Sequence, residues 1–401
     1  MQRLDVKLNS TVVGSIRLIP GDRATFEFSD DYLAQGYKDR TLSLSFLNEA
    51  GLPEQPARSY QRRLPPWFSN LLPEGALRKF ISQSLGVAEH REAELIKHLG
   101  NDLPGAVEIT TVEDDFELAE DLYQTQEAEL RFSLAGVQLK FSAQWSDQHH
   151  LTIPAKGVGG DWIVKMPSPI YAGVPENEAA IMALAKAVGI DVADFELLPM
   201  EMLGNIPEKV NLAENHFLAV RRFDRLDGKK IHMEDFCQIL NLYPDDKYTS
   251  ANYATLGRAL YLLGGEADFI EYLKRLVFNV IIGNGDMHLK NWSVLYCDPT
   301  KPRLSPAYDL LTTIPYIKGE SLALNLSKEK SFAHIRLSHF RTLAEKSMGS
   351  LSIVDDLVFE TTRNILASYR DVIAAYSLPA FITESLDNHI VQMGKNLSLK
   401  P

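Results

Sequence analysis

One short segment of the chain, residues 283–291 (GNGDMHLKN), combines residue types that can carry out phosphoryl transfer. The turn-forming residues Asn284 and Gly285 follow a long apolar stretch, so we expect a loop at the end of a helix. Asp286 can orient an attacking hydroxyl group and accept its proton. Asn291 offers an amide oxygen to Mg²⁺, which neutralises charge on a transferred phosphoryl group. The segment therefore predicts the catalytic loop of a magnesium-dependent phosphotransferase.

A second carboxylate, Asp309, follows a predicted strand over residues 292–295. The order Asp, Asn, strand, Asp fits such an enzyme, and the five-residue spacing from Asp286 to Asn291 is that of the protein-kinase catalytic loop. Asp286 taken alone fits a purely structural turn equally well, and only the combination favours catalysis. His288 is an alternative metal ligand, but without an HExxH motif or a Cys/His cluster we expect no zinc.

A kinase also needs a lysine on a strand, paired with a glutamate on a helix. Lys165 ends the apolar run Trp162-Ile-Val164, and Glu178 lies near the start of a predicted helix. We therefore predict that Lys165 pairs with Glu178, although a lone lysine at a strand end usually faces solvent. Residues 157–160 (GVGG) precede this strand, but Trp162 stands where a phosphate loop would have its third glycine, so we expect a hairpin turn there.

These candidate residues are embedded in a mixed pattern of strands and helices. The acidic stretch 113–129 has no basic residue and predicts a solvated linker or exposed face at a domain boundary. The periodicity predicts a β-hairpin within 4–16, helices over 76–85 and 90–99, strands within 130–165, a helix over 175–187, strands over 194–200 and 216–223, and helices over 269–282, 353–375 and 379–395. This order is typical of a bilobal α+β enzyme.

Composition excludes several classes of protein. The 401 residues carry a net charge of −12, which argues against broad, non-specific nucleic-acid binding. Cys237 and Cys297 are the only cysteines, so neither a disulfide framework nor a four-cysteine zinc site is possible. The N-terminal sequence MQRLDVKLNS lacks an apolar signal region, and no apolar run is long enough to cross a membrane. We expect a cytoplasmic protein without membrane association.

Several motifs together resemble the HipA family of serine/threonine kinases, which are toxins of bacterial toxin–antitoxin modules. They occur in the family's order and span nearly the whole chain: Phe68-x-x-Leu71-Leu-Pro-Glu-Gly75, Leu99-Gly100-x-Asp102-x-x-Gly105-Ala-Val107, Ser133-Leu-Ala-Gly136-Val-Gln138-Leu-Lys140, Ile163-Val-Lys165-Met-Pro167, Asn177-Glu178, Val220-Arg-Arg-Phe223-Asp-Arg225, Glu234-Asp235 with Gln238, the 286–291 loop and Tyr308-Asp309. Each motif is weak alone, but the ordered set is specific.

The resemblance implies an α+β, bilobal protein-kinase-like fold with an added N-terminal β-rich subdomain and a mainly helical C-lobe. The N-terminal subdomain would cover residues 1–110. The kinase N-lobe would cover 111–225, with the phosphate loop, the Lys165 strand, the Glu178 helix and the hinge. The helical C-lobe, with the catalytic and metal-binding loops, would cover 226–401.

The resemblance also implies roles for individual residues. Asp286 would be the catalytic base, Asn291 and Asp309 would bind Mg²⁺, and Glu178 would be the helix partner of Lys165. Ser133 matches the family's autophosphorylation position, where a phosphate adds about −1.5 to −2 charges and would switch the enzyme off. The implied ATP site consists of Ala135, Gly136, Val137, Gln138, Leu139 and Lys140 around the phosphates, Lys165 at the α- and β-phosphates, Arg221, Arg222 and Phe223 as the hinge for adenine, and His288, Leu289, Lys290, Asn291, Tyr308 and Asp309.

A HipA-like kinase would bind a HipB-like helix-turn-helix antitoxin, and through it operator DNA. Its protein substrate would be linked to translation, such as an aminoacyl-tRNA synthetase, so that phosphorylation arrests growth. Two other functions remain open. The Asp-x-His-x-x-Asn pattern also resembles aminoglycoside kinases, although these lack the N-terminal subdomain. The fold could also serve as a non-catalytic transcriptional co-repressor, although the chemistry-bearing side chains are intact.

Overall fold

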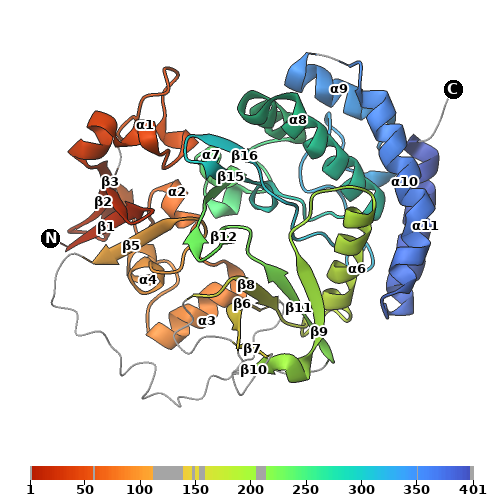
Figure 1. The fold of residues 1–401 in the computed structure, drawn as a ribbon, viewed down its shortest axis with the longest axis horizontal. Coiled ribbons are helices and arrows are strands. Elements are labelled where there is room, and N and C mark those ends of the chain that lie inside the picture. Colours follow the sequence, from red (N-terminus) through yellow and green to blue (C-terminus); the bar gives the residue numbers. More distant parts are fainter. Residues whose placement is uncertain are drawn as a thin grey trace.

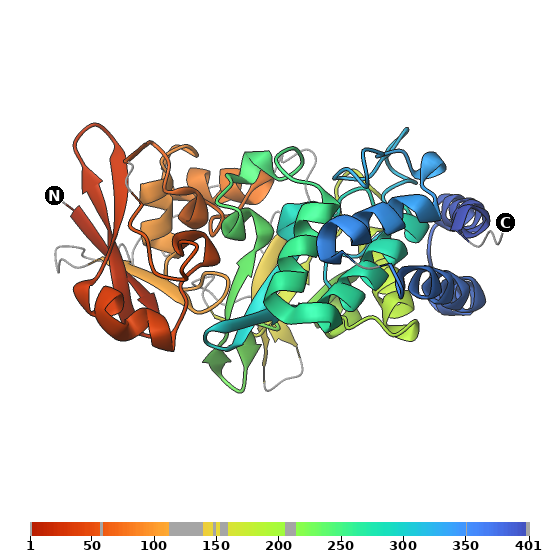
Figure 2. The ribbon, with the colours of Figure 1, turned by 90° about the horizontal axis from the view of Figure 1, so that it is seen from above.

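The computed structural model describes residues 2–56, 59–111, 139–146, 150–152, 159–204, 214–349 and 351–397. The N-terminal sheet lies at one end of the molecule and the last two helices lie at the other (Figures 1 and 2). Three clusters of buried apolar side chains follow this order: one in the N-terminal region (residues 2–111), one in a central sheet, and one that joins a central helix to the C-terminal helices.

The N-terminal region is built on a five-stranded antiparallel sheet. Its strands lie in the order β4-β3-β2-β1-β5, with β1 (Gln2–Leu8), β2 (Thr11–Ile19), β3 (Arg23–Phe28), β4 (Tyr60–Gln61) and β5 (Val107–Thr111). The predicted hairpin is confirmed, because Asn9 and Ser10 turn the chain with positive φ between β1 and β2. The same region contains a π-helix (Tyr32–Gly36), a 3₁₀ helix (Leu44–Phe46), and α1 (Tyr37–Asp39), α2 (Pro66–Ser69), α3 (Gly75–Leu85) and α4 (Glu92–Leu99).

A six-stranded central sheet carries the predicted lysine strand. Its order is β10-β7-β6-β8-β11-β9, with β6 (Lys140–Trp145), β7 (Leu151–Thr152), β8 (Trp162–Lys165), β9 (Phe195–Pro199), β10 (Leu203–Gly204) and β11 (His216–Arg221). A 3₁₀ helix (Met200–Met202) joins β9 to β10. Helix α6 (Val174–Ala187) matches the prediction: Pro175 suits the first turn, and the chain leaves the helix at Gly189 with φ +80°.

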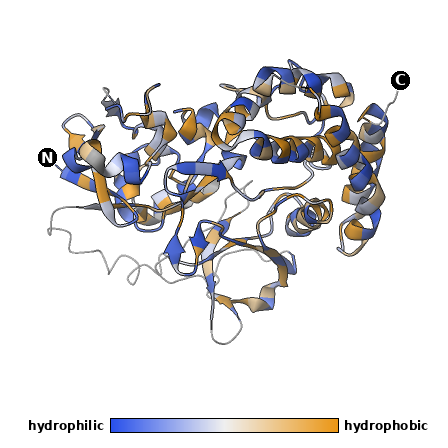
Figure 3. Ribbon diagram, turned by 45° about the horizontal axis from the view of Figure 1, so that its top comes forward, coloured by the Kyte–Doolittle hydropathy of each residue, from blue (hydrophilic) through white to orange (hydrophobic). Residues whose placement is uncertain are grey.

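The remaining chain is mainly helical. Asn252 caps α8 (Tyr253–Ile282) by accepting the Thr255 N–H at 3.0 Å, and the helix ends at Gly283 with φ +69°. Gly265 breaks its regular geometry. Helices α10 (Val354–Ala374) and α11 (Ala380–Leu397) confirm the last two predicted helices, whereas α9 (Leu337–Met348) was not predicted. These C-terminal helices mix hydrophobic and hydrophilic residues along the ribbon, as expected for helices with one buried side (Figure 3).

Shorter elements surround the catalytic-loop sequence. They are β12 (Arg225–Leu226) paired with β13 (Lys229–Lys230), the sheet β14 (His232–Asp235), β15 (Ser293–Asp298) and β16 (Lys301–Leu304), helix α7 (Phe236–Ile239), and 3₁₀ helices at Pro244–Asp246, Leu289–Asn291 and Phe332–His334. Strand β15 confirms the strand expected between Asn291 and Asp309. The predicted α+β class is therefore confirmed.

Several predicted features lie outside the described residues: the acidic stretch 113–129, Ser133, residues 135–138, and residues 157 and 158 of the hairpin turn expected at 157–160. The domain boundaries proposed from the sequence stay predictions. Within the part of the chain that the structure describes, no helix is both long enough and apolar enough to span a bilayer.

Candidate active site

Two lysines and two carboxylates from four separate elements meet at one point. Lys140 and Lys165 are directly opposed on the antiparallel strands β6 and β8, so both side chains project from the same face of the sheet. Lys165 Nζ forms ion pairs with Glu178 Oε1 on α6 and with Asp309 Oδ1. Lys140 Nζ donates to Asp309 Oδ2 at 2.9 Å. The predicted Lys165–Glu178 pair is therefore present, and Asp309 joins it.

Burial and charge balance shape the ionisation of this cluster. Lys165 and Glu178 are almost fully buried, whereas Lys140 is more exposed. Burial alone would raise the pKa of Asp309, but Lys140 and Lys165 outweigh it and hold the pKa well below its ordinary value. Two positive and two negative side chains give the cluster no net charge. Asp309 is thus an ionised carboxylate whose two oxygens both have lysine partners.

The predicted catalytic loop follows the end of α8. The Asp286 N–H donates to Asn284 Oδ1 at 3.0 Å, and the Asp286 carbonyl accepts Asn291 Nδ2 at 2.8 Å. The Asp286 side chain is half exposed, and its Oδ1 accepts the Tyr248 hydroxyl at 2.6 Å. Burial raises the pKa of Asp286, while the bond from Tyr248 and the charge of Lys247 oppose this shift. The loop therefore presents a carboxylate with one committed oxygen.

Charge interactions connect this loop to the lysine cluster. The charge of Asp309 contributes to the raised pKa of Asp286, and the charge of Lys140 opposes it. The two carboxylates therefore lie within electrostatic range of each other, although Asp286 and Asp309 come from different loops. Asn291 lies at the base of the Asp286 loop. The three residues predicted to serve proton transfer and metal binding are gathered in one part of the structure.

The three residues before Asn291 have different surroundings. His288 is buried with its ring against Tyr248 at a centroid distance of 4.9 Å, and burial lowers its pKa to about 3. Leu289 is part of the apolar core. Lys290 Nζ donates to Asp235 Oδ2 at 2.7 Å and to Asn70 Oδ1 at 3.0 Å. The Lys290 ammonium thus links the loop to Asn70 of the N-terminal region. Because this ammonium is bonded to Asn70 and Asp235, its position does not support the predicted contact with ATP.

Two backbone N–H groups of the predicted hinge are hydrogen-bonded within the protein. The Arg221 N–H donates to the Asp194 carbonyl and the Arg222 N–H to the Asp161 carbonyl, both at 2.7 Å. The Arg221 side chain is exposed, whereas the Arg222 side chain is buried. The rings of Phe223 and Tyr308 lie 5.4 Å apart at a tilt of 46°. Phe223 of the hinge thus lies next to the ring of Tyr308. The role of the hinge backbone in binding adenine stays a prediction.

Residues that the sequence analysis missed also belong to this region. Tyr248 contacts Asp286, and Lys247 pairs with Glu74 of the N-terminal region at 2.7 Å. Neither residue forms a recognisable motif with the catalytic loop, from which about forty positions separate them. Leu139 was predicted at the phosphates; its side chain is buried and its carbonyl accepts the Met166 N–H at 2.9 Å. Only folding brings these groups together.

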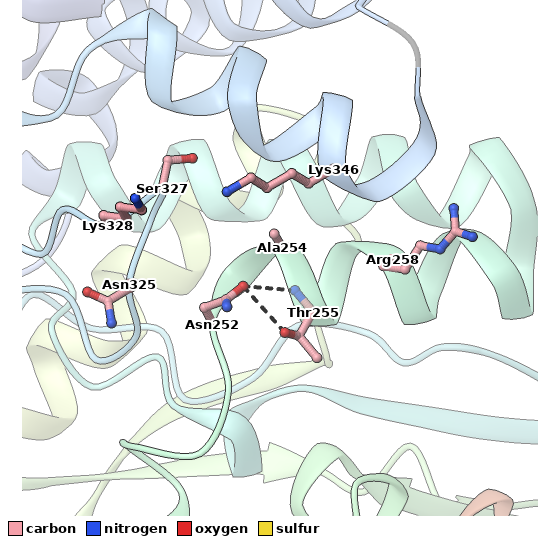
Figure 4. Close-up of a pocket in the computed structure, with 8 residues that line it drawn as sticks. All are labelled: Asn252, Ala254, Thr255, Arg258, Asn325, Ser327, Lys328 and Lys346. Carbon is pink, nitrogen blue, oxygen red and sulfur yellow. Dashed lines mark hydrogen bonds between the residues drawn. The ribbon is translucent and has the colours of Figure 1, made fainter.

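A cavity of about 620 Å³ lies elsewhere, at the N-terminus of α8 (Figure 4). Figure 4 shows Thr255 hydrogen-bonded to the Asn252 side chain, with the basic side chains of Arg258, Lys328 and Lys346 nearby. The lining residues are Asn252, Ala254, Thr255, Arg258, Asn325, Ser327, Lys328 and Lys346. They include none of the predicted catalytic or ATP-binding residues, so this cavity is separate from the candidate site.

Known proteins resemble the chain over almost its whole length. The family model of the HipA-like C-terminal domain matches residues 132–375, and that of the HipA N-terminal domain matches residues 4–110. A putative kinase of Sinorhizobium fredii is 43% identical over 392 residues, which cover 96% of each chain. The serine/threonine-protein kinase toxin HipA of Shewanella oneidensis is 27% identical over 303 residues, covering 65% of this chain and 66% of that protein.

A solved structure has the same fold. In a complex of the Shewanella oneidensis toxin–antitoxin system, which contains HipA, HipB and operator DNA, one chain matches with a TM-score of 0.75. The match covers 99% of this chain and 98% of that chain at 21% identity, so it confirms the fold. Because the C-terminal family model alone spans more than half of the sequence and the N-terminal model covers most of the rest, the chain belongs to the HipA family of kinases.

Proposed function

We propose that this chain is a Mg²⁺–ATP-dependent serine/threonine protein kinase that acts as the toxin of a toxin–antitoxin pair. One observation carries the proposal: Lys165 is paired with Glu178 and Asp309, and Tyr308, the neighbour of Asp309, donates its hydroxyl to the Lys290 carbonyl in the 286–291 loop at 2.9 Å. A strand lysine, a helix glutamate, a metal-binding aspartate and a loop aspartate are the parts that phosphoryl transfer requires. Membership of a kinase family implies the use of ATP.

The donor groups fit Mg²⁺ and a triphosphate. Asp309 supplies an ionised carboxylate, and Asn291 donates its Nδ2 to the backbone, which leaves its amide oxygen for a cation. Two oxygen ligands are enough for Mg²⁺, because it keeps waters and binds substrate phosphates as well. Lys140 and Lys165 would exchange their contacts with Asp309 for contacts with the phosphates. Residues 135–139 would surround the same phosphates. Bound Mg²⁺ would neutralise phosphate charge. Residues 221–223, with Tyr308, would hold adenine.

Asp286 would act as the general base. Its Oδ1 is held by Tyr248, so Oδ2 is the oxygen that would accept the proton of a serine or threonine hydroxyl. The hydroxyl oxygen then forms its bond to the γ-phosphorus as the bond to the bridging oxygen breaks and ADP leaves. Burial lowers the pKa of His288 to about 3, so its imidazole is a weaker base than the Asp286 carboxylate, whose pKa is raised. His288 would therefore not compete with Asp286 for the proton of the hydroxyl group.

The relatives support a proposal for the wider biological role. The Shewanella oneidensis protein is named a serine/threonine-protein kinase toxin, and its structure contains HipB and operator DNA. We extend this to a HipB-like helix-turn-helix antitoxin that contacts operator DNA, to a translation-linked substrate such as an aminoacyl-tRNA synthetase, and to inactivating autophosphorylation at Ser133. The N-terminal region supports this role over that of an aminoglycoside phosphotransferase, since aminoglycoside kinases lack such a region.

The test compares Asp286→Asn with Asp298→Asn, which makes the same change at an exposed position on β15. Transfer of labelled phosphate from ATP to protein should fall by about 10²–10⁴-fold in Asp286→Asn and stay unchanged in Asp298→Asn. Phosphopeptide mapping should locate the label of the wild-type protein at Ser133. Transfer by Asp286→Asn at the wild-type rate would contradict the proposal. Label on an aminoglycoside rather than on protein would favour the small-molecule enzyme. Failure to bind Mg²⁺–ATP, together with tight, antitoxin-dependent operator binding, would favour the co-repressor.

A further inference from the structure

Asp102 of the N-terminal region reaches the hinge. It lies between α4 and β5, and its side chain is only 8% exposed. Its Oδ1 accepts Arg222 Nη1 at 3.1 Å and Arg225 Nη2 at 3.0 Å. Its Oδ2 accepts the Gly159 N–H at 3.0 Å and the Ser142 hydroxyl at 3.2 Å. The Asp102 carboxylate thus joins the N-terminal region to the hinge, to β6 and to the segment that enters β8.

The groups around Asp102 form a closed arrangement. Asp224 accepts Arg222 Nη2 at 2.9 Å and Arg225 Nη1 at 2.8 Å, so two buried arginines are balanced by two buried aspartates. Burial alone would raise the pKa of Asp102, but Arg222, the Gly159 N–H and Arg225 together lower it. The carboxylate therefore stays charged. A buried charge network of this kind adds little net stability, but it can fix the relative position of the elements that supply it.

We propose that Asp102 is a positioning residue for nucleotide binding, which sets the hinge relative to the two strands that carry Lys140 and Lys165. Ser142 lies two residues after Lys140 on β6, and Gly159 lies three residues before the start of β8 at Trp162. Arg222 is in the predicted adenine hinge. Asp102 touches neither Asp286 nor Asp309 in the described structure, so its loss should weaken nucleotide binding and leave the transfer step itself intact. This inference rests on the proposed kinase function.

The rival explanation is that Asp102 only attaches the N-terminal region to the rest of the chain. A matched ion pair separates the two explanations. Glu108 on β5 pairs with Lys230 on β13 at 2.8 Å, and so it joins the same region to the hairpin that follows the hinge. It contacts neither the hinge nor the central sheet among the described residues. Glu108→Gln is therefore the control for loosened attachment.

The experiment compares Asp102→Asn with Glu108→Gln in the full chain, below the unfolding temperature of each. In Asp102→Asn the KM for ATP should rise about tenfold while kcat changes by less than about twofold, since one charge-assisted contact to the hinge is lost. Without nucleotide, hydrogen–deuterium exchange should become faster at the Gly159, Arg221 and Arg222 amides. Glu108→Gln should change neither quantity. Should Asp102→Asn fail to fold, Arg225→Lys replaces it, because lysine cannot bridge both Asp102 and Asp224.

The possible outcomes are distinct. An unchanged KM in Asp102→Asn, or an equal rise in Glu108→Gln, would overturn the positioning role. A fall in kcat with unchanged KM would overturn it as well, since the effect would then lie on the transfer step. If the wild-type protein transfers no phosphate at all, the proposed kinase function fails, and the exchange measurement still shows whether Asp102 holds the hinge.

Discussion

Replacing Lys165 by methionine removes the charge that two carboxylates share. The side chain of Lys165 is 4% exposed and lies between Glu178, which is 2% exposed, and Asp309, which is 22% exposed. Methionine keeps the apolar stem and deletes the ammonium group. The perturbation is therefore electrostatic, and the packing of β8 against its neighbours should survive.

The size of the effect follows from burial. Breaking a buried ion pair by removing one partner costs about 3–5 kcal/mol. Two features place Lys165→Met near the lower limit: Lys140 stays on Asp309 at 2.9 Å, and burial raises the pKa of Glu178, so this carboxyl can bind a proton once its partner is gone. We expect a loss of about 3 kcal/mol in the free energy of unfolding. Lys165→Met with Glu178→Gln removes both charges and should lose only about 1 kcal/mol.

Urea unfolding at pH 7, followed by circular dichroism, measures these losses, and phosphate transfer is assayed on the same samples. The control is Lys186→Met on α6, where the ion pair with Asp194 is mostly exposed; its loss should stay below about 0.5 kcal/mol. Stability should recover in the double variant, but activity should not, because the phosphate-binding ammonium is still missing. A loss in Lys165→Met no larger than in Lys186→Met, or a double variant as unstable as the single one, would refute the reasoning.

Two further predictions concern the N-terminal region and its contacts. Burial lowers the pKa of His232 to about 4, so from pH 6.5 down to 4 the unfolded chain binds a proton that the folded chain does not. The free energy of unfolding should therefore fall by about 3 kcal/mol over this range. In urea titrations at pH 7 and pH 4.5, His232→Gln should not show this contribution to the pH dependence. Gly105 has φ +74°, and an added Cβ would lie 2.8 Å from the Met233 nitrogen, so Gly105→Ala should cost more than about 2 kcal/mol, whereas Gly86→Ala, with φ +65° and open space, should cost about 1 kcal/mol in thermal unfolding.

Local signals explain which elements were predictable. Helix α6 combines a proline in its first turn, a stripe of alanines and a terminal glycine, and the structure has it one residue from the predicted start. The strand ending at Lys165 was visible from its apolar run, and the pairing with Glu178 was predicted because kinases pair a strand lysine with a helix glutamate. Helix α9 was not predicted, although Phe340, Leu343 and Ala344 lie at helical spacing and form its buried side.

Contacts between distant residues were beyond the reach of these signals. Lys290 was predicted to lie against the nucleotide, but its ammonium reaches Asn70, 220 positions earlier. The bond between Tyr248 and Asp286 and the bonds of Asp102 to the hinge are of the same kind. Such pairs depend on how separately folded elements dock, which spacing along the chain does not encode. The roles assigned to the catalytic and nucleotide-binding residues stay predictions until they are tested.

The long separation between partners also has a consequence for synthesis. Lys140 and Lys165 have left the ribosome well before Asp309, which lies 169 and 144 positions after them. At about 5–20 residues per second, translation needs roughly ten to thirty seconds to cover such an interval. A nascent chain therefore holds both lysines before Asp309 is made, with Glu178 present as a partner for Lys165. Any message cut short before that codon yields a product whose catalytic machinery is never assembled.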